Sequence, residues 1–170
     1  MSTERSRDPY VILASVIICA TVILVALIFL RLFRIPFFNV VIFGISNSAV
    51  HWLGWIGTLY IAAVTPLYSV VKRRSPVHLR GMLKVHVLGN LISVMLISIH
   101  FAHQVTRSPS NYPDLGTGIV LYLAMILLVS TGFMTYTGSA KRFTKQMRFL
   151  HPSVALTFYL TIVLHIIHGL

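Results

Sequence analysis

Residues 82–104 read MLKVHVLGNLISVMLISIHFAHQ, an apolar run of helical length with a histidine near each end. His86 and His100 are 14 residues apart, which on an α-helix is about 21 Å of rise and about 3.9 turns. The two imidazoles therefore lie on nearly the same helix face, roughly 40° apart. In a bilayer whose hydrocarbon core is about 30 Å thick, one imidazole lies near each edge.

The arrangement recurs in residues 147–170, MRFLHPSVALTFYLTIVLHIIHGL. Three histidines match at a constant offset of 65 residues, and the chain has only eight. Matches of Ile and Val between apolar helices carry little information, whereas three histidines in register carry more. The sequence therefore predicts a repeat of two-helix units. The matching pairs are His86/His151, His100/His165 and His103/His168.

The composition is that of an integral membrane protein. Of 170 residues, 56% are hydrophobic and 10% are charged, a balance unlike that of a soluble domain. The net charge of +11 comes from Lys and Arg in short loops, where such residues act as topology signals, so we expect no nucleic-acid partner. The single Cys19 excludes an intramolecular disulfide and a c-type haem attachment motif. Glu4, Asp8 and Asp114 all lie outside the apolar runs, which disfavours a proton-coupled pump.

We expect an all-α integral membrane fold with five transmembrane helices. The two-helix repeat comprises spans 2–3 and 4–5, which form a haem-binding bundle. Residues 1–49 are predicted to be an N-terminal anchor helix and an interfacial segment, and residues 50–170 a four-helix di-haem cytochrome b domain. In residues 35–49, Phe37, Phe38 and Phe43 suit the membrane interface, and the stretch from Gly44 to Ser48 is typical of a turn. The predicted spans are 10–33, 51–71, 79–105, 117–136 and 149–170.

The distribution of Lys and Arg predicts the orientation in the cell membrane. Eleven of the 14 fall on one side of the predicted spans, and Arg31, Arg34 and Arg107 fall on the other. The positive-inside rule places the N-terminus in the cytoplasm and the C-terminus outside. One span separates the two histidine-bearing helices, so these run parallel. His86 and His151 then share the inner level, and His100 and His165 share the outer level.

Four histidines paired at two depths predict haem ligation. A lone histidine on an apolar helix is more often a hydrogen-bonded core residue, but polar residues inside a membrane are functional candidates. Neutral imidazole is a standard axial ligand of haem iron. We therefore expect two haem b groups, one held by His86 and His151 and one by His100 and His165. His103 and His168 are alternative outer ligands, although His103 is rotated about 100° from the face of His86.

Other polar residues carry weaker expectations. Arg80, Lys84 and Arg148 are candidates for contacts with haem propionates, and the competing interpretation is that they are ordinary positive-inside loop charges. His51 either caps a turn or borders the outer haem or a quinone pocket. Gly89, close to His86, either gives room for a porphyrin or aids helix packing.

Short motifs around these histidines resemble a known superfamily. His86-Val-Leu-Gly89 and Ile99-His100 resemble the histidine–glycine and leucine–histidine pattern of the ferric-reductase-like transmembrane domain. Phe149-Leu150-His151 and Leu164-His165 are similar to its second haem helix, and residues 63–67, AVTPL, to the end of its preceding helix. Residues 130–133, STGF, followed by His151 and the 165–168 stretch, are similar to b-type cytochrome subunits of hydrogenases and formate dehydrogenases. The resemblance covers residues 50–170 and implies axial ligation by His86, His100, His151 and His165.

These features together predict transmembrane electron transfer by a di-haem membrane subunit of a redox complex. The partners would be other subunits of that complex, the lipid membrane and a quinone. The sequence has no phosphate-binding glycine motif, so we expect any flavin centre, and any catalytic residue, to belong to a partner chain. One alternative is a transition-metal-ion transporter or channel with paired intramembrane histidines. A third is a passive anchor or assembly subunit with one haem or none.

Overall fold

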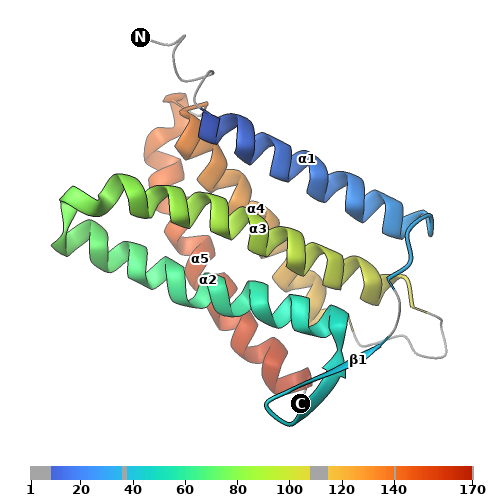
Figure 1. Ribbon diagram of the computed structural model, residues 1–170. Helices are drawn as coiled ribbons and strands as arrows, with labels where there is room; N and C mark the ends of the chain where they lie inside the picture. Colours follow the sequence, from blue (N-terminus) through green and yellow to red (C-terminus); the bar gives the residue numbers. More distant parts are fainter. Residues whose placement is uncertain (1–8, 36–37, 108–114, 140, 170) are drawn as a thin grey trace. The chain divides into compact units, whose positions relative to one another are not determined.

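The computed structural model describes residues 9–35, 38–107, 115–139 and 141–169, apart from the side chains of Pro76 and His168. This part of the chain contains five helices that are long and apolar enough to cross a membrane (Figure 1). The structure agrees with the prediction of a helical membrane protein with five helices able to span the bilayer, whereas the two-helix repeat and the haem-binding bundle stay predictions. Which end of the chain lies in the cytoplasm stays a prediction. The helices are α1 (Pro9–Phe29), α2 (Ala49–Arg74), α3 (Leu79–Val105), α4 (Gly116–Thr137) and α5 (Thr144–Gly169).

The helix bounds follow the predicted spans closely at α3 and less closely elsewhere. Helix α3 has the predicted bounds. Helix α1 ends at Phe29, four residues before the predicted end, and Arg31 just beyond it has a positive φ of 57°. Helix α5 starts at Thr144, five residues before the predicted span. The apolar pattern marks the stretch that suits lipid, whereas basic residues with good helix propensity let the helix begin before that stretch.

The segment before α2 is a β-hairpin. Strands β1 (Asn39–Ile42) and β2 (Ile45–Ser48) pair antiparallel, and Ile42 opposite Ile45 closes a two-residue loop. That loop is Phe43-Gly44, with φ of 52° and 80°, the backbone pattern of a type I′ turn. The predicted turn from Gly44 to Ser48 is therefore wrong in extent, because Ser46 and Asn47 belong to a strand. The β-branched residues of the segment favour pairing over an irregular loop.

The chain forms two compact units. The N-terminal unit spans residues 7–113 and contains α1, the hairpin, α2 and α3. In it, α3 packs against both α1 and α2, and the 3-10 turn η2 (Pro76–His78) joins α2 to α3. The C-terminal unit begins at residue 114 and contains α4 and α5. These two helices pack together and are joined through the 3-10 turn η4 (Lys141–Phe143). The predicted domain boundary at residues 49–50 stays a prediction.

Glycines allow α2 and α3 to approach closely. A Cβ on Gly57 would lie 2.8 Å from the carbonyl oxygen of Ser93 and 2.9 Å from Cγ1 of Ile97. A Cβ on Gly89 would collide with the hydroxyl of Tyr60, which donates a hydrogen bond of 3.0 Å to the carbonyl of Val85. Small residues serve membrane helix packing in this way. The space beside Gly89 therefore accommodates Tyr60, which supports the helix-packing interpretation over room for a porphyrin.

Candidate functional site

His86 lies on α3, and its ring is held from two directions. Nδ1 lies 3.2 Å from Nδ2 of Asn90, one turn further along the same helix. The ring of Tyr68, on α2, stacks on the imidazole with centroids 4.6 Å apart and planes 13° apart. These contacts fix the ring relative to the α2–α3 pair. The sequence gives no pattern that singles out Tyr68, because its contact depends on the register of α2 against α3.

His100 lies at the other end of α3 and reaches across to the start of α2. Its Nδ1 donates a hydrogen bond of 3.2 Å to the backbone carbonyl of Val50. A carbonyl oxygen only accepts, so Nδ1 carries a hydrogen, and in a neutral imidazole the lone pair then lies on Nε2. The ring also lies against Gly54, where a Cβ would be 3.1 Å from Cγ of His100. Helix α2 thus determines both the orientation and the tautomer of His100.

His51, in the first turn of α2, borders His100. The two rings meet edge to face, with centroids 4.9 Å apart and planes 73° apart. Nδ1 of His51 lies 3.0 Å from the hydroxyl of Ser48, the N-cap of α2, and 3.5 Å from the amide nitrogen of Gln104. The structure therefore places His51 beside the helix cap and against His100, and a border with an outer haem or a quinone pocket stays a prediction.

In the C-terminal unit, His151 is held by α4. Its Nδ1 lies 3.1 Å from Oγ1 of Thr131. The Thr131 hydroxyl lies 2.9 Å from each of two backbone carbonyls of its own helix, those of Leu127 and Leu128. A hydroxyl has one hydrogen and two lone pairs, so with the hydrogen directed to the backbone, Oγ1 accepts from Nδ1. His151 then carries its lone pair on Nε2, as His100 does.

His165 has an equivalent environment on the same two helices. Its Nδ1 lies 3.0 Å from Oγ1 of Thr117. The glycine that follows each threonine lies beside the same ring: a Cβ on Gly118 would be 3.5 Å from Cε1 of His165, and one on Gly132 would be 2.9 Å from Cε1 of His151. The two Thr-Gly pairs are 14 residues apart on α4, and the two histidines are 14 residues apart on α5. This shared spacing is the sequence signal that would have identified the threonines.

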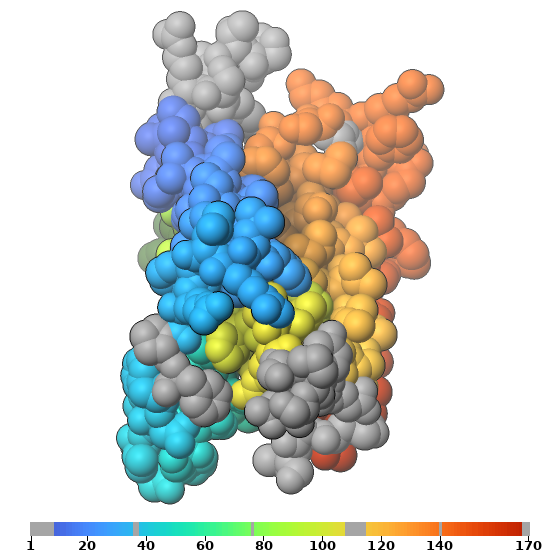
Figure 2. Space-filling view, turned by 90° about the vertical axis from the view of Figure 1, so that its right-hand side faces the viewer, coloured from blue at the N-terminus to red at the C-terminus, as the bar shows by residue number. Residues whose placement is uncertain are grey.

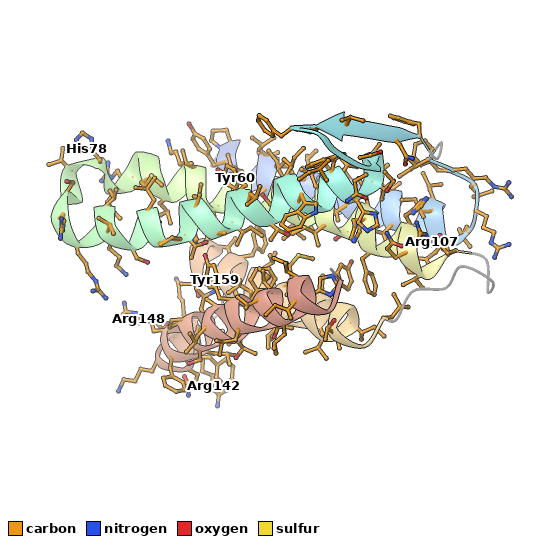
Figure 3. The ribbon with its side chains drawn as sticks, turned by 90° about the horizontal axis from the view of Figure 1, so that it is seen from below. Tyr60, His78, Arg107, Arg142, Arg148 and Tyr159 are labelled. Atoms are coloured by element: carbon orange, nitrogen blue, oxygen red, sulfur yellow. The ribbon has the colours of Figure 1, made fainter. Side chains whose placement is uncertain are left out.

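The helix segments that carry the histidines contain no charged side chains, which lie instead toward the helix ends. Residues 85–105 and 149–170 contain no Asp, Glu, Lys or Arg. Figure 3 labels His78 and Arg107 at opposite ends of the α2–α3 pair. Of the propionate candidates, Arg80 and Arg148 are exposed. Nζ of Lys84 lies 3.8 Å from the ring centroid of Tyr10 on α1. Contacts with propionates stay a prediction for all three.

His86 and His100 lie in the N-terminal unit, and His151 and His165 lie in the C-terminal unit. Each predicted haem would take one ligand from each unit. Pairing of His86 with His151, and of His100 with His165, therefore stays a prediction. His103 is half-buried on α3, and the side chain of His168 lies outside the described residues. Among the described residues no group of three or more His, Cys, Asp or Glu could hold a metal ion. The ion-transport alternative also stays a prediction.

Comparisons of the chain with protein-family models, with curated proteins and with solved structures found no match.

Proposed function

We propose that the chain is a membrane cytochrome b that binds two haems through paired histidines and carries electrons across the bilayer. The observation that supports this most strongly is a contact that the four rings share, although the partner differs from ring to ring. Each helix pair holds two imidazoles 14 residues apart, with Nδ1 of every ring at hydrogen-bond distance from a group of its own unit. Histidines that ligate metals typically use one nitrogen in this way, which fixes the tautomer and orients the other nitrogen.

The element bounds support the proposed repeat. The 3-10 turn at residues 76–78 recurs at 141–143, and α3 and α5 start at residues 79 and 144. Both offsets are 65 residues, the offset of the histidines. His86 and His151 therefore occupy the same position, seven residues after the start of their helices. This agreement is independent of the histidines themselves, because turn position is set by the connecting residues.

The donor set fits haem iron. His100 and His151 carry a hydrogen on Nδ1, so Nε2 is the nitrogen that would bind iron. His86 acquires the same tautomer when the amide oxygen of Asn90 faces Nδ1. That oxygen is buried and has no hydrogen-bond partner among the described residues, and turning the amide about its Cβ–Cγ bond would bring it to the ring. Haem supplies the one-electron chemistry, and the chain supplies ligands, spacing and an apolar surrounding.

His86 and His100 are separated by about 21 Å of helix rise, and haems bound at these two levels would be separated accordingly. We propose that electrons pass between these levels, and so between redox partners on the two faces of the membrane. The partners proposed are other subunits of a redox complex, with a quinone as a further electron carrier. The long apolar stretches around the histidines keep water and competing charges away from both levels.

The test is the haem content of single-histidine variants purified from membranes. His100→Ala and His165→Ala should each lose the outer haem and retain the inner one, whereas His86→Ala and His151→Ala should do the reverse. His78→Ala, in the exposed turn between α2 and α3, is the matched control and should retain both. Variants at His100 and His165 that lose different haems would contradict the proposed pairing.

A further inference from the structure

The β-hairpin before α2 has an apolar, uncharged tip. Residues 38–48, FNVVIFGISNS, contain no charged side chain. Three large apolar residues around the turn are exposed: Val41 is 65% exposed, Phe43 is 100% exposed and Ile45 is 59% exposed. Exposed clusters of this kind mark surfaces that are covered by a partner or by lipid.

Hydrogen bonds fix the hairpin to the start of α2. Trp52 Nε1 donates to the carbonyl of Val40 at 2.9 Å, and the backbone N–H of Ala49 donates to the carbonyl of Phe38 at 3.1 Å. The Ser48 hydroxyl accepts from the N–H of His51 and thereby caps the helix. Since α2 is a membrane-spanning helix, the hairpin lies at the membrane face where α1 ends and α2 begins. In Figures 1 and 2 the hairpin, in cyan, lies at this end of the N-terminal unit.

The turn itself is strained by Phe43. Both loop residues have positive φ, a conformation that favours Asn followed by Gly. Gly44 suits its position, whereas a bulky aromatic residue in the left-handed region is an outlier. No neighbour covers its side chain, which is fully exposed. A strained residue with no compensating contact in its own unit suggests that the compensation comes from outside the chain.

The arrangement of the exposed residues favours lipid as the partner. Val41 is opposite Ser46 and Ile45 is opposite Ile42, so Val41 and Ile45 point to opposite faces of the hairpin. Apolar residues on both faces and at the tip suit immersion better than one-sided docking on a protein surface. The exposed Arg31 and Arg34 lie at the same membrane face, where arginine side chains pair with the phosphates of lipid head groups. We propose that Val41, Phe43 and Ile45 insert into the interfacial layer of the bilayer and anchor the entry of α2.

The single cysteine of the chain permits a direct measurement of depth. In a Cys19→Ser background, a nitroxide spin label is attached at Phe43→Cys, and the protein is reconstituted into phosphatidylcholine–phosphatidylglycerol vesicles. Power saturation then compares collisions with oxygen, which concentrates in the bilayer, and with a water-soluble nickel chelate. Val77→Cys is the control, since Val77 is 90% exposed in the η2 turn among charged residues.

The proposal predicts that the label at position 43 collides more with oxygen than with the chelate, and that the label at position 77 does the reverse. A chelate preference at position 43 would overturn it, as would protection from both reagents, which would indicate a protein partner. A second experiment tests the contribution of the Phe43 side chain itself, with the label placed at position 45. Phe43→Asn suits the turn and keeps the hairpin, so a label at Ile45→Cys should lose oxygen preference in that background. An unchanged ratio would contradict anchoring by Phe43.

Discussion

The position of one hydrogen on each imidazole decides which nitrogen can bind a metal. At His100 the acceptor is a backbone carbonyl, and at His151 it is a threonine hydroxyl whose own hydrogen is directed to its helix. Hydrogen bonding at Nδ1 raises the basicity of the ligating nitrogen. The contact of His100 with the carbonyl of Val50 has no sequence signal. A threonine in an apolar helix ordinarily bonds only to its own backbone, so Thr131 is indicated only by the 14-residue spacing that the two Thr-Gly pairs share with His151 and His165. The four histidines could be selected as candidate ligands from the sequence, because their spacing along the chain is visible without knowledge of the neighbouring helices.

Thr131→Val should alter the inner haem without removing it. Loss of the acceptor makes Nε2 of His151 less basic, stabilises oxidised iron less, and so raises the midpoint potential of one haem. The expected shift corresponds to about 1 kcal/mol, the contribution of a typical hydrogen bond. Redox titration monitored by visible absorption measures it. Thr131→Ser keeps the hydroxyl and should leave the potential unchanged. Equal behaviour of the Val and Ser variants would contradict the role assigned to Thr131.

Gly132→Ala and Gly118→Ala form a matched pair on α4. The new Cβ would lie 2.9 Å from the ring of His151 in the first variant and 3.5 Å from the ring of His165 in the second. The first distance requires the ring to move, while the second is an ordinary van der Waals contact. Gly132→Ala should therefore reduce binding of the inner haem, and Gly118→Ala should be tolerated. Haem quantification per purified chain checks this, and the prediction fails when both variants retain two haems.

At the scale of elements, the helices were more predictable than the segment that links α1 to α2. Long apolar runs without charges predict spanning helices, and α3 has the predicted bounds. The hairpin was missed because each strand has only four residues, and short apolar runs do not distinguish a strand from an interfacial stretch. The sequence also did not indicate which glycines lie at the contact between α2 and α3. Gly57 and Gly89 are identified only by the residues that pack against them in the structure.

Gly57→Ala should destabilise the α2–α3 pair. Its Cβ would lie 2.8 Å from a backbone carbonyl oxygen, which cannot move away as the end of a side chain can. Overpacking of this kind costs about 1–3 kcal/mol. Gly81→Ala on α3 is the control, because among the described residues no atom beyond its chain neighbours and its own helix backbone lies within 4 Å of its Cβ position, and Ala is a better helix former than Gly. Thermal unfolding in detergent should show a lower midpoint for Gly57→Ala alone, and equal midpoints would contradict this packing account.

At the scale of the whole molecule, composition alone predicts a membrane protein, and the five helices agree with it. The histidine offset predicted a repeat, and the turns at residues 76–78 and 141–143 add a second feature with the same offset. The predicted pairing of His86 with His151, and of His100 with His165, concerns the whole molecule, because it would join residues of both units. It depends on whether the four imidazoles bind haem. Orientation likewise depends on the charges of the connecting segments, which the fold of each unit does not determine.

The most direct test of the central claim is the haem content of the purified chain, measured as a pyridine haemochrome together with an oxidised-minus-reduced visible spectrum. The account predicts two haem b per chain, both low-spin when oxidised, because each iron has two imidazole ligands. One haem per chain would mean that one histidine level is assigned wrongly. No haem absorbance after expression with adequate haem supply would contradict the cytochrome assignment.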